Sequence, residues 1–254
     1  MLAVISPAKK LDFTPAPTQV PATLPRMQTD ANKLARVAKG LSADDLRALM
    51  DISDDLANLN RKRFKAFKRK SDETNSKQAM LAFAGDVYAG LNAGDFEDDD
   101  VAYAQDHLRI LSGLYGVLRP LDRIQPYRLE MGSRMENSAG ATLYAYWGGK
   151  LAKALDKDAG GAPVVNLASQ EYFRAANEKA MKSPVVAVDF KEERNGKFQV
   201  ISFFAKRARG AMARFIVEQR VDRVDGLQDF DAEGYRYNAA LSEPTKLTFT
   251  RAAA

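Results

Sequence analysis

The spacing of apolar residues along the chain predicts alternating strands and helices. The apolar run at 2–5 and the apolar-rich run at 164–167, which contains Asn166, are typical of short buried strands, and 245–251 is expected to form a last strand. Apolar positions recur at helical spacing in four further segments, and these predict helices at 26–39, 75–91, 142–155 and 206–220.

Capping and turn residues mark several boundaries. Ser42 is followed three residues later by Asp45, which matches the spacing of a capping box at a helix start. Gly40 is expected to end the preceding helix. Asn195 and Gly196 separate two apolar-rich runs, and both residues tolerate positive φ, so the sequence predicts a β-hairpin over 184–202.

Three other segments have distinctive composition. The proline-rich residues 15–25 are expected to form an extended surface connection, and 119–132 an irregular one. Five carboxylates within 95–100 precede a helix that runs toward Arg109. They could hold a metal ion, but we favour their complementing the helix N-terminus. Without repeats, low-complexity blocks or long linkers, residues 1–254 are expected to form a single mixed α+β domain.

The composition excludes several classes of chemistry. The chain has no cysteine and a single histidine, His107. Thiolate nucleophiles, iron–sulfur clusters and ordinary zinc sites therefore cannot form, and no cofactor or metal is expected. The apolar N-terminal run is too short for a signal peptide or a membrane span, so we expect a cytoplasmic protein with no membrane partner.

The net charge of +5 is concentrated in one segment. Removing the seven cations of residues 61–70 leaves the rest of the chain at −2. Phe64 and Phe67 share one helical face there and could aim the cations outward. A solvated charged face is the alternative, but we favour a surface that binds phosphate. Its cations are Arg61, Lys62, Arg63, Lys65, Lys68, Arg69 and Lys70.

The preceding residues, 46–59, have the apolar spacing of a helix-hairpin-helix. In that unit the hairpin presents backbone N–H groups to a DNA phosphate, and Ser53 would cap the second helix. Asp51 and Ser53 stand where glycines are usual, and Asp54 and Asp55 would repel a phosphate. An ordinary pair of packed helices remains an equal alternative.

A second basic segment lies on the predicted helix at 206–220. Arg207 and Arg214 are one heptad apart, with Gly210 and another small residue between them, which could let a phosphate backbone approach closely. Ion pairs within the protein are the alternative. The candidate DNA-binding residues of this segment are Lys206, Arg207, Arg209 and Arg214.

Polar residues also follow the two predicted strands, where sites of α/β proteins often form. An irregular segment carrying an arginine and a glutamate could join them in a pocket. The catalytic candidates among them are Lys9, Lys10, Asp12, Glu130 and Glu171. Further residues that could line a cleft are Ser6, Arg119, Arg128, Asn166 and Ser169.

Six segments in this order resemble the signatures of the YaaA family of bacterial peroxide-stress-resistance proteins. They are SPAKKLD at 6–12, FAGDVYAGL at 83–91, LSGLYGVLRP at 111–120, PYRLEMG at 126–132, NLASQEYF at 166–173 and KRARG at 206–210. The resemblance extends from residue 1 to about 237. It implies a family-specific α+β fold with a helix-hairpin-helix and a positively charged cleft. It also implies binding to double-stranded and structurally distorted DNA, a link to DNA repair, and lower free iron during peroxide stress.

These features indicate two possible functions. The first is DNA binding through backbone contacts, since no helix has base-reading residues in a recognition pattern. The second is an enzyme acting on DNA or a nucleotide, in which Lys9 or Lys10 is the nucleophile and Asp12, Glu130 or Glu171 the acid–base partner. A weaker third class is a regulator that binds iron or a metabolite through carboxylates. A lysine buried beside a carboxylate would favour the enzyme, and exposed cations would favour binding.

Overall fold

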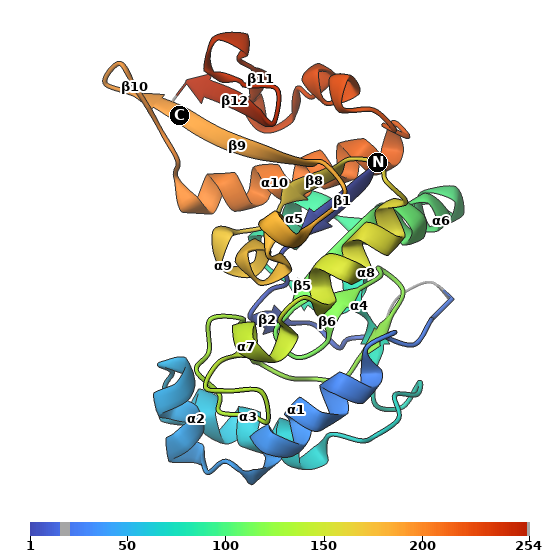
Figure 1. The fold of residues 1–254 in the computed structure, drawn as a ribbon, viewed down its shortest axis with the longest axis vertical. Coiled ribbons are helices and arrows are strands. Elements are labelled where there is room, and N and C mark those ends of the chain that lie inside the picture. The colour runs from blue at the N-terminus through green and yellow to red at the C-terminus, as the bar shows by residue number, and fades with distance from the viewer. Residues whose placement is uncertain (16–20, 253–254) are drawn as a thin grey trace.

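A mostly parallel sheet runs through the protein (Figure 1). The computed structural model describes residues 1–15 and 21–252, and within them the sheet has the order β11-β12-β9-β8-β1-β5-β6, with β10 paired to β9. Its parallel strands are β1 (Leu2–Ile5), β5 (Leu108–Ser112), β8 (Val164–Leu167), β9 (Val185–Arg194) and β12 (Lys246–Ala252). Antiparallel neighbours are β6 (Gly116–Leu118), β10 (Lys197–Gln199) and β11 (Arg236–Tyr237).

The three strands predicted from apolar runs are confirmed as β1, β8 and β12. Every residue of β1 is buried, because this strand lies at the centre of the sheet and is covered on both faces. The hairpin is confirmed between β9 and β10, where Asn195 and Gly196 have φ of 52° and 71°. The expected single mixed domain is also confirmed, since one continuous hydrophobic core joins the helices and strands.

The order in which strands are added to the sheet changes side at β1. β5 pairs with one side of β1, and the chain later returns to place β8 on the other side. In sheets of this kind, the carboxyl ends of the two strands at such a switch point diverge and leave a crevice. Ser6 and Ser169 lie just beyond those two ends.

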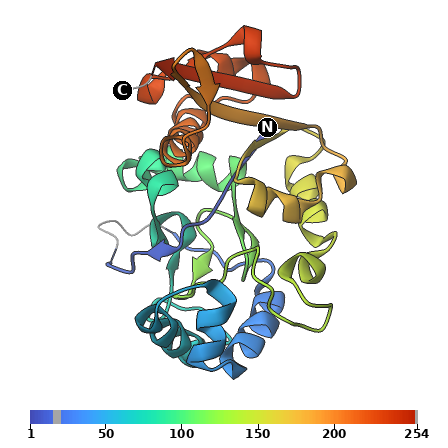
Figure 2. The same cartoon turned by 90° about the vertical axis from the view of Figure 1, so that its left-hand side faces the viewer.

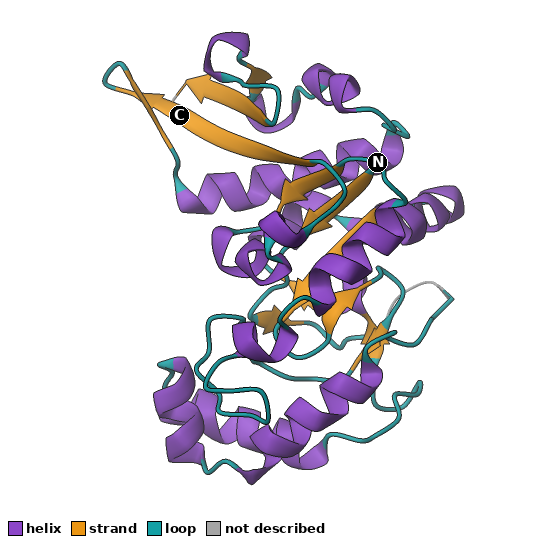
Figure 3. Cartoon of the chain, viewed as in Figure 1, coloured by secondary structure: helices purple, strands orange, loops and turns teal. Residues whose placement is uncertain are grey.

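Helices cover the sheet and form a separate layer at one end of the molecule (Figures 1, 2 and 3). That end holds α1 (Gln28–Gly40), α2 (Ala43–Met50) and α3 (Asp54–Ala66). The other helices are α4 (Ala79–Ala82), α5 (Asp86–Leu91), α6 (Asp98–His107), α7 (Leu143–Trp147), α8 (Lys150–Ala159), α9 (Gln170–Phe173) and α10 (Ser202–Glu218). None of the described helices is long and apolar enough to cross a membrane.

Two predicted helix starts are confirmed by their caps. The Ser42 hydroxyl accepts from the backbone N–H of Asp45, and the Asp45 carboxylate accepts in return from the backbone N–H of Ser42. Glu97 and Asp100 form the same reciprocal arrangement at α6. Asp98, Asp99 and Asp100 lie in the first turn of α6, where their charges complement the helix N-terminus.

Two predicted helices are wrong as single elements. Residues 75–91 form β3 (Lys77–Gln78), α4, β4 (Phe83–Ala84) and α5, because β3 and β4 pair with β7 (Arg123–Ile124) and β2 (Lys10–Leu11). Likewise, 142–155 is divided into α7 and α8 at Gly148, whose φ is 46°. The short β7 also interrupts the irregular segment 119–132. Of the proline-rich 15–25, residues 16–20 lie outside the described part.

Helices α5 and α10 cross at backbone contact distance. A Cβ added to Gly210 would lie 1.8 Å from the carbonyl oxygen of Val87, and one added to Gly90 would lie 2.1 Å from that of Arg207. Only glycine fits at both positions. The close approach expected at Gly210 is therefore occupied by α5, which corrects the prediction that it admits a phosphate backbone.

Candidate functional site

Hydrogen bonds between segments distant in the sequence join the two loops beyond β1 and β8, which border the expected crevice. The Ser169 N–H donates to Ser6 Oγ at 2.8 Å, which joins the loop after β8 to the loop after β1. The Tyr88 hydroxyl of α5 donates to the Ser6 carbonyl at 3.1 Å. The two serines therefore hold the loops after β1 and β8 together through these hydrogen bonds.

A charged cluster lies beside this crevice. Lys9 Nζ is 3.1 Å from Glu130 Oε2, and Arg128 donates to Glu130 Oε1 from Nε at 3.1 Å and from Nη2 at 2.9 Å. The Lys9 side chain is 64% exposed, whereas those of Arg128 and Glu130 are mostly buried. Glu130 is thus a carboxylate held between two cations.

Glu171 and Tyr172 border the same cluster. Glu171 Oε1 accepts the Gly132 N–H at 2.9 Å, two residues beyond Glu130. Burial, followed by the proximity of Tyr127, Glu171 and Glu130, raises the pKa of Tyr172 well above its usual value. The Tyr172 hydroxyl therefore stays neutral and can donate a hydrogen bond.

The other candidate site residues of these loops form no hydrogen bond or ion pair with the charged cluster in the described part of the chain. Lys10 is exposed on β2, and the Asp12 carboxylate accepts the Thr14 N–H at 2.8 Å, which lowers the Asp12 pKa. Asn166 Oδ1 accepts the Ala168 N–H at 3.0 Å, and Arg119 pairs with Asp122 at 2.8 Å. The structure thus brings together Ser6, Lys9, Arg128, Glu130, Ser169 and Glu171.

Helices α2 and α3 form the pair predicted at 46–59. Ser53 caps α3 by accepting the Leu56 N–H at 3.4 Å, and Asp51 takes the left-handed conformation with φ of 49°. Asp54 pairs with Arg47 of α2 at 3.4 Å. Asp51 therefore adopts the left-handed conformation that glycine usually supplies in this turn. The carboxylates of Asp51 and Asp54 remain at the turn, where a phosphate would have to bind.

The cations of 61–70 extend from the last turns of α3. Six of the seven are exposed and lie within ion-pair distance of no described carboxylate: Arg61, Lys62, Lys65, Lys68, Arg69 and Lys70. Arg63 differs, because its guanidinium is partly buried and contacts Asn60. Burial, and then the positive charge of Arg128, lowers the pKa of Arg63. Arg63 therefore lies close enough to Arg128 of the charged cluster for their like charges to repel each other.

Helix α1 contributes cations that the sequence analysis did not single out. Lys33, Arg36 and Lys39 line a groove of about 410 Å³ together with Arg69, and Phe64 and Phe67 line it as well. None of the described residues lining this groove is acidic. The signal was present in the sequence, since cations three residues apart lie on one face of a helix.

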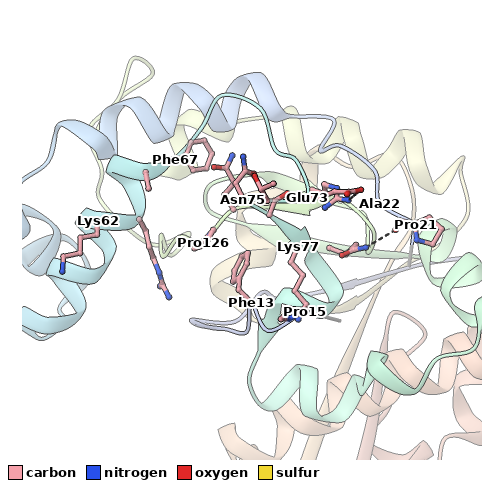
Figure 4. Close-up of a pocket in the computed structure, with 17 residues that line it drawn as sticks. Phe13, Pro15, Pro21, Ala22, Lys62, Phe67, Glu73, Asn75, Lys77 and Pro126 are labelled. Carbon is pink, nitrogen blue, oxygen red and sulfur yellow. Dashed lines mark hydrogen bonds and ion pairs between the residues drawn. The ribbon is translucent and has the colours of Figure 1, made fainter. Parts of the chain in front are cut away.

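A larger cavity of about 1120 Å³ lies on the other side of Phe67 (Figure 4). Lys62 and Arg63 of α3 line it, and so do Lys77, which donates to the carbonyls of Asp12 and Thr14, and Arg123. Its aromatic walls are Phe13 and Phe67. The last turns of α3 therefore stand between two basic hollows. We call residues 61–70 and the α1 cations Lys33, Arg36 and Lys39 the basic surface.

The α10 candidates do not form one basic stripe. Arg207 pairs with Glu233 at 2.8 Å and Arg214 with Glu218 at 2.7 Å, while Lys206 is exposed. Arg214 also donates to the Asn92 carbonyl at 2.8 Å, beyond the end of α5. These ion pairs match the alternative in which the arginines of this helix pair with carboxylates of the protein itself. Arg209 is partly buried, and its Nε is not exposed to solvent.

Comparison with known proteins defines the family. The model of the family described as peroxide stress protein YaaA matches residues 1–241. This chain belongs to the YaaA family. A relative named UPF0246 protein from Caulobacter vibrioides strain NA1000 is 52% identical, covering 99% of both chains. Another from Dinoroseobacter shibae is 54% identical over 99% of this chain and 95% of its own length. One from Idiomarina loihiensis is 49% identical, covering 99% of both.

The YaaA-like segments converge in space. The segments at 6–12, 126–132 and 166–173 supply the cluster of Lys9, Glu130 and Glu171. The segment at 83–91 supplies Tyr88, and it crosses the segment at 206–210 through Gly90 and Gly210. The YaaA resemblance thus marks one connected region, whereas the basic surface lies outside those segments.

Proposed function

We propose that this member of the peroxide stress family binds DNA, gripping the sugar–phosphate backbone of duplex or distorted DNA. The observation that carries the proposal is the groove between α1 and residues 64–69, where four cations meet and no described carboxylate lines the walls. Cations held together without counter-charges repel one another unless an anion screens them. A polyanion bound there would neutralise both the cations of the groove and the exposed cations of α3.

Backbone contacts fit this surface better than base reading. Lysines and arginines without neighbouring asparagine or glutamine in a recognition pattern supply affinity but little sequence information. Such a protein favours sites that are easy to bend, because distorted DNA costs less to deform. We therefore expect little sequence specificity and a preference for bent or unpaired DNA.

Protection against peroxide through DNA is consistent with the rest of the chain. Without cysteine, the protein lacks the thiol that peroxidases use. The ring of His107 stacks on Tyr103 at 4.0 Å, and its Nδ1 is 3.1 Å from the Met1 carbonyl, so this histidine has structural contacts. Shielding or repairing DNA is therefore a more economical role than direct removal of peroxide.

Titration of labelled duplex, bubble and junction DNA over a range of salt concentrations tests the proposal. If about five phosphates are neutralised, the logarithm of the binding constant falls with the logarithm of salt at a slope of about −4 to −5. A slope near zero would contradict electrostatic binding. A strong footprint at one sequence on random linear duplex would contradict backbone recognition.

A second candidate function, an enzyme acting on DNA or a nucleotide, is favoured by the position of the Lys9–Glu130 pair. A lysine within 3.1 Å of a carboxylate, next to a topological switch point, has the placement of a nucleophile with its acid–base partner. The high exposure of Lys9 weighs against it, because reactive lysines are usually desolvated. Product analysis on the DNA samples, with Lys9→Gln as the comparison, tests this function.

A further inference from the structure

A cavity of about 450 Å³ opens where β9 continues past the end of β8. Figure 1 shows the longer β9 beside β8. The last paired position is Asn166–Ala187, after which β8 ends at Leu167 while β9 extends to Arg194. Helix α10 and the segment after β8 close the other sides. This volume lies within the range of small-molecule sites. Its polar lining is Asn166, Gln170, Arg174, Glu178, Asp189 and Arg209.

Arg209 is the unusual member of this lining. Its Nε is buried without a hydrogen-bond partner, and Arg209 forms no ion pair within the described residues. The neighbouring arginines of α10 do form them, Arg207 with Glu233 and Arg214 with Glu218. A guanidinium stays charged in proteins, and burial lowers the pKa of Arg209 even though the nearby charge of Asp189 opposes that effect. An anion seated in the cavity would supply the missing partner.

The other polar groups define what else a ligand would meet. Arg174 stands on the lining with its guanidinium 5.1 Å from the centre of the Tyr144 ring, and it forms no ion pair with a described residue. Asn166 uses its oxygen to accept the Ala168 N–H, which leaves its NH₂ group to donate. Glu178 and Asp189 are acceptors, although Asp189 is already paired with Lys246 at 3.0 Å.

We propose that this cavity binds a small free oxyanion, a carboxylate or a phosphate group, held by Arg209 and Arg174. Planar guanidinium groups bind both oxyanions through paired hydrogen bonds. The carboxylates of Glu178 and Asp189 favour a ligand that also carries a donor such as an amine. The cavity is lined by residues separate from the basic surface, so the inference is independent of DNA binding.

Isothermal titration and thermal melting of the full chain with inorganic phosphate, acetate and glycine test the inference and separate the two oxyanions. At least one probe should bind at one site per chain and raise the Tm by about 3–6 °C at ten times its Kd. Arg209→Gln should weaken that binding about tenfold or more. The matched control, Arg207→Gln, changes an arginine of the same helix outside the cavity and should leave probe binding unchanged.

Saturable binding by none of the three probes would overturn the inference, as would unchanged affinity in Arg209→Gln. If that variant does not fold, the exposed Arg174→Gln decides, with a weakening of about tenfold expected and equal affinity counting against the site. Competition with duplex DNA separates this site from the proposed DNA surface. Displacement of the probe by DNA would overturn a site for a free small molecule.

Discussion

Lys9 Nζ and Glu130 Oε2 lie 3.1 Å apart, although the two residues come from the loop after β1 and the irregular segment before α7. The same carboxylate binds Arg128 through its other oxygen. Glu130 is thus shared between an exposed lysine and a mostly buried arginine. The two cations depend on it to different degrees, and this difference can be measured.

Glu130→Gln should destabilise the fold more than Lys9→Gln. Removing the carboxylate charge leaves the mostly buried Arg128 without its ionic partner, at a cost of about 1.5–3 kcal/mol in unfolding free energy. Lys9→Gln changes an exposed side chain and should alter stability by less than about 0.5 kcal/mol. Urea denaturation of both variants measures the difference. Equal losses would mean that the Lys9 contact is as important to the fold as the Arg128 contact.

Neutralising exposed cations of α3 should weaken DNA binding without changing the fold. The variant Arg61→Gln with Lys62→Gln and Lys65→Gln removes three charges that have no described ionic partner, and it leaves the partly buried Arg63 in place. If each cation contacts a phosphate, the salt slope should become shallower by about 2.7. Anisotropy titrations beside thermal melts measure both properties.

A matched control for that variant replaces Lys206, an exposed cation outside the basic surface, with glutamine. Its affinity for DNA should stay close to that of the parent protein. Unchanged binding by the triple variant would show that the α3 cations are a solvated face, and the α1 cations Lys33, Arg36 and Lys39 would be tested next. Loss of Tm together with affinity would show that the segment is needed for the fold.

Gly210→Ala should be strongly destabilising. The added methyl group would meet the Val87 carbonyl oxygen at 1.8 Å, so α5 and α10 must move apart at a cost of about 1–3 kcal/mol or more. In a protein of this size each kcal/mol lowers the Tm by about 2–4 °C. Gly40→Ala is the control, because nothing lies within 4 Å of its added Cβ. An unchanged Tm in Gly210→Ala would contradict the backbone contact between these helices.

Asp158→Asn should reveal a buried ion pair. The side chains of Asp158 and Arg109 are 6% and 4% exposed, and Oδ2 lies 2.6 Å from Nε. Breaking such a pair by removing one charge costs about 3–5 kcal/mol. The exposed Asp231, 3.7 Å from Arg236, offers a control in which Asp231→Asn changes stability by less than about 1 kcal/mol.

The same pair predicts a dependence on pH. Burial alone would raise the pKa of Asp158, but the hydrogen bond and charge of Arg109, and then those of Arg26, outweigh it and hold the pKa below the usual 3.8. A carboxylate with a lowered pKa in the folded state stabilises the protein fully above pH 3.8, and this contribution is lost as pH falls through the lowered value. Denaturation at pH 6 should therefore separate parent and Asp158→Asn, and the gap should narrow in acid.

Local signals in the sequence were sufficient for much of the fold. β1 and β8 follow from runs of mostly apolar residues, the α2 start from Ser42 and Asp45, and the β9–β10 hairpin from two residues that accept positive φ. Each of these elements depends on neighbours within a few residues. The basic segment at the end of α3 was visible for the same reason, as charge clustered along the chain.

The features that the sequence did not reveal depend on distant partners. Phe83 matched a helical spacing, yet it lies in β4 because Leu11 of β2, far away in the chain, pairs with it. The burial of Arg209 beside β9 and the ion pair of Arg207 with Glu233 depend on segments outside α10, which no local pattern predicts. The groove lined by α1 needed the packing of α1 against residues 64–69.

The order of strands in the central sheet has a consequence for synthesis of the protein. β1 is synthesised before the other strands of the sheet, yet both of its partners, β5 and β8, are made much later, and β9 must wait for β12. Pairings between such distant segments are slow to form, and unpaired strand edges promote aggregation meanwhile. The nascent chain therefore exposes the apolar β1 until most of the protein has been made. A holding chaperone should bind its early translation intermediates and release them once β8 has emerged.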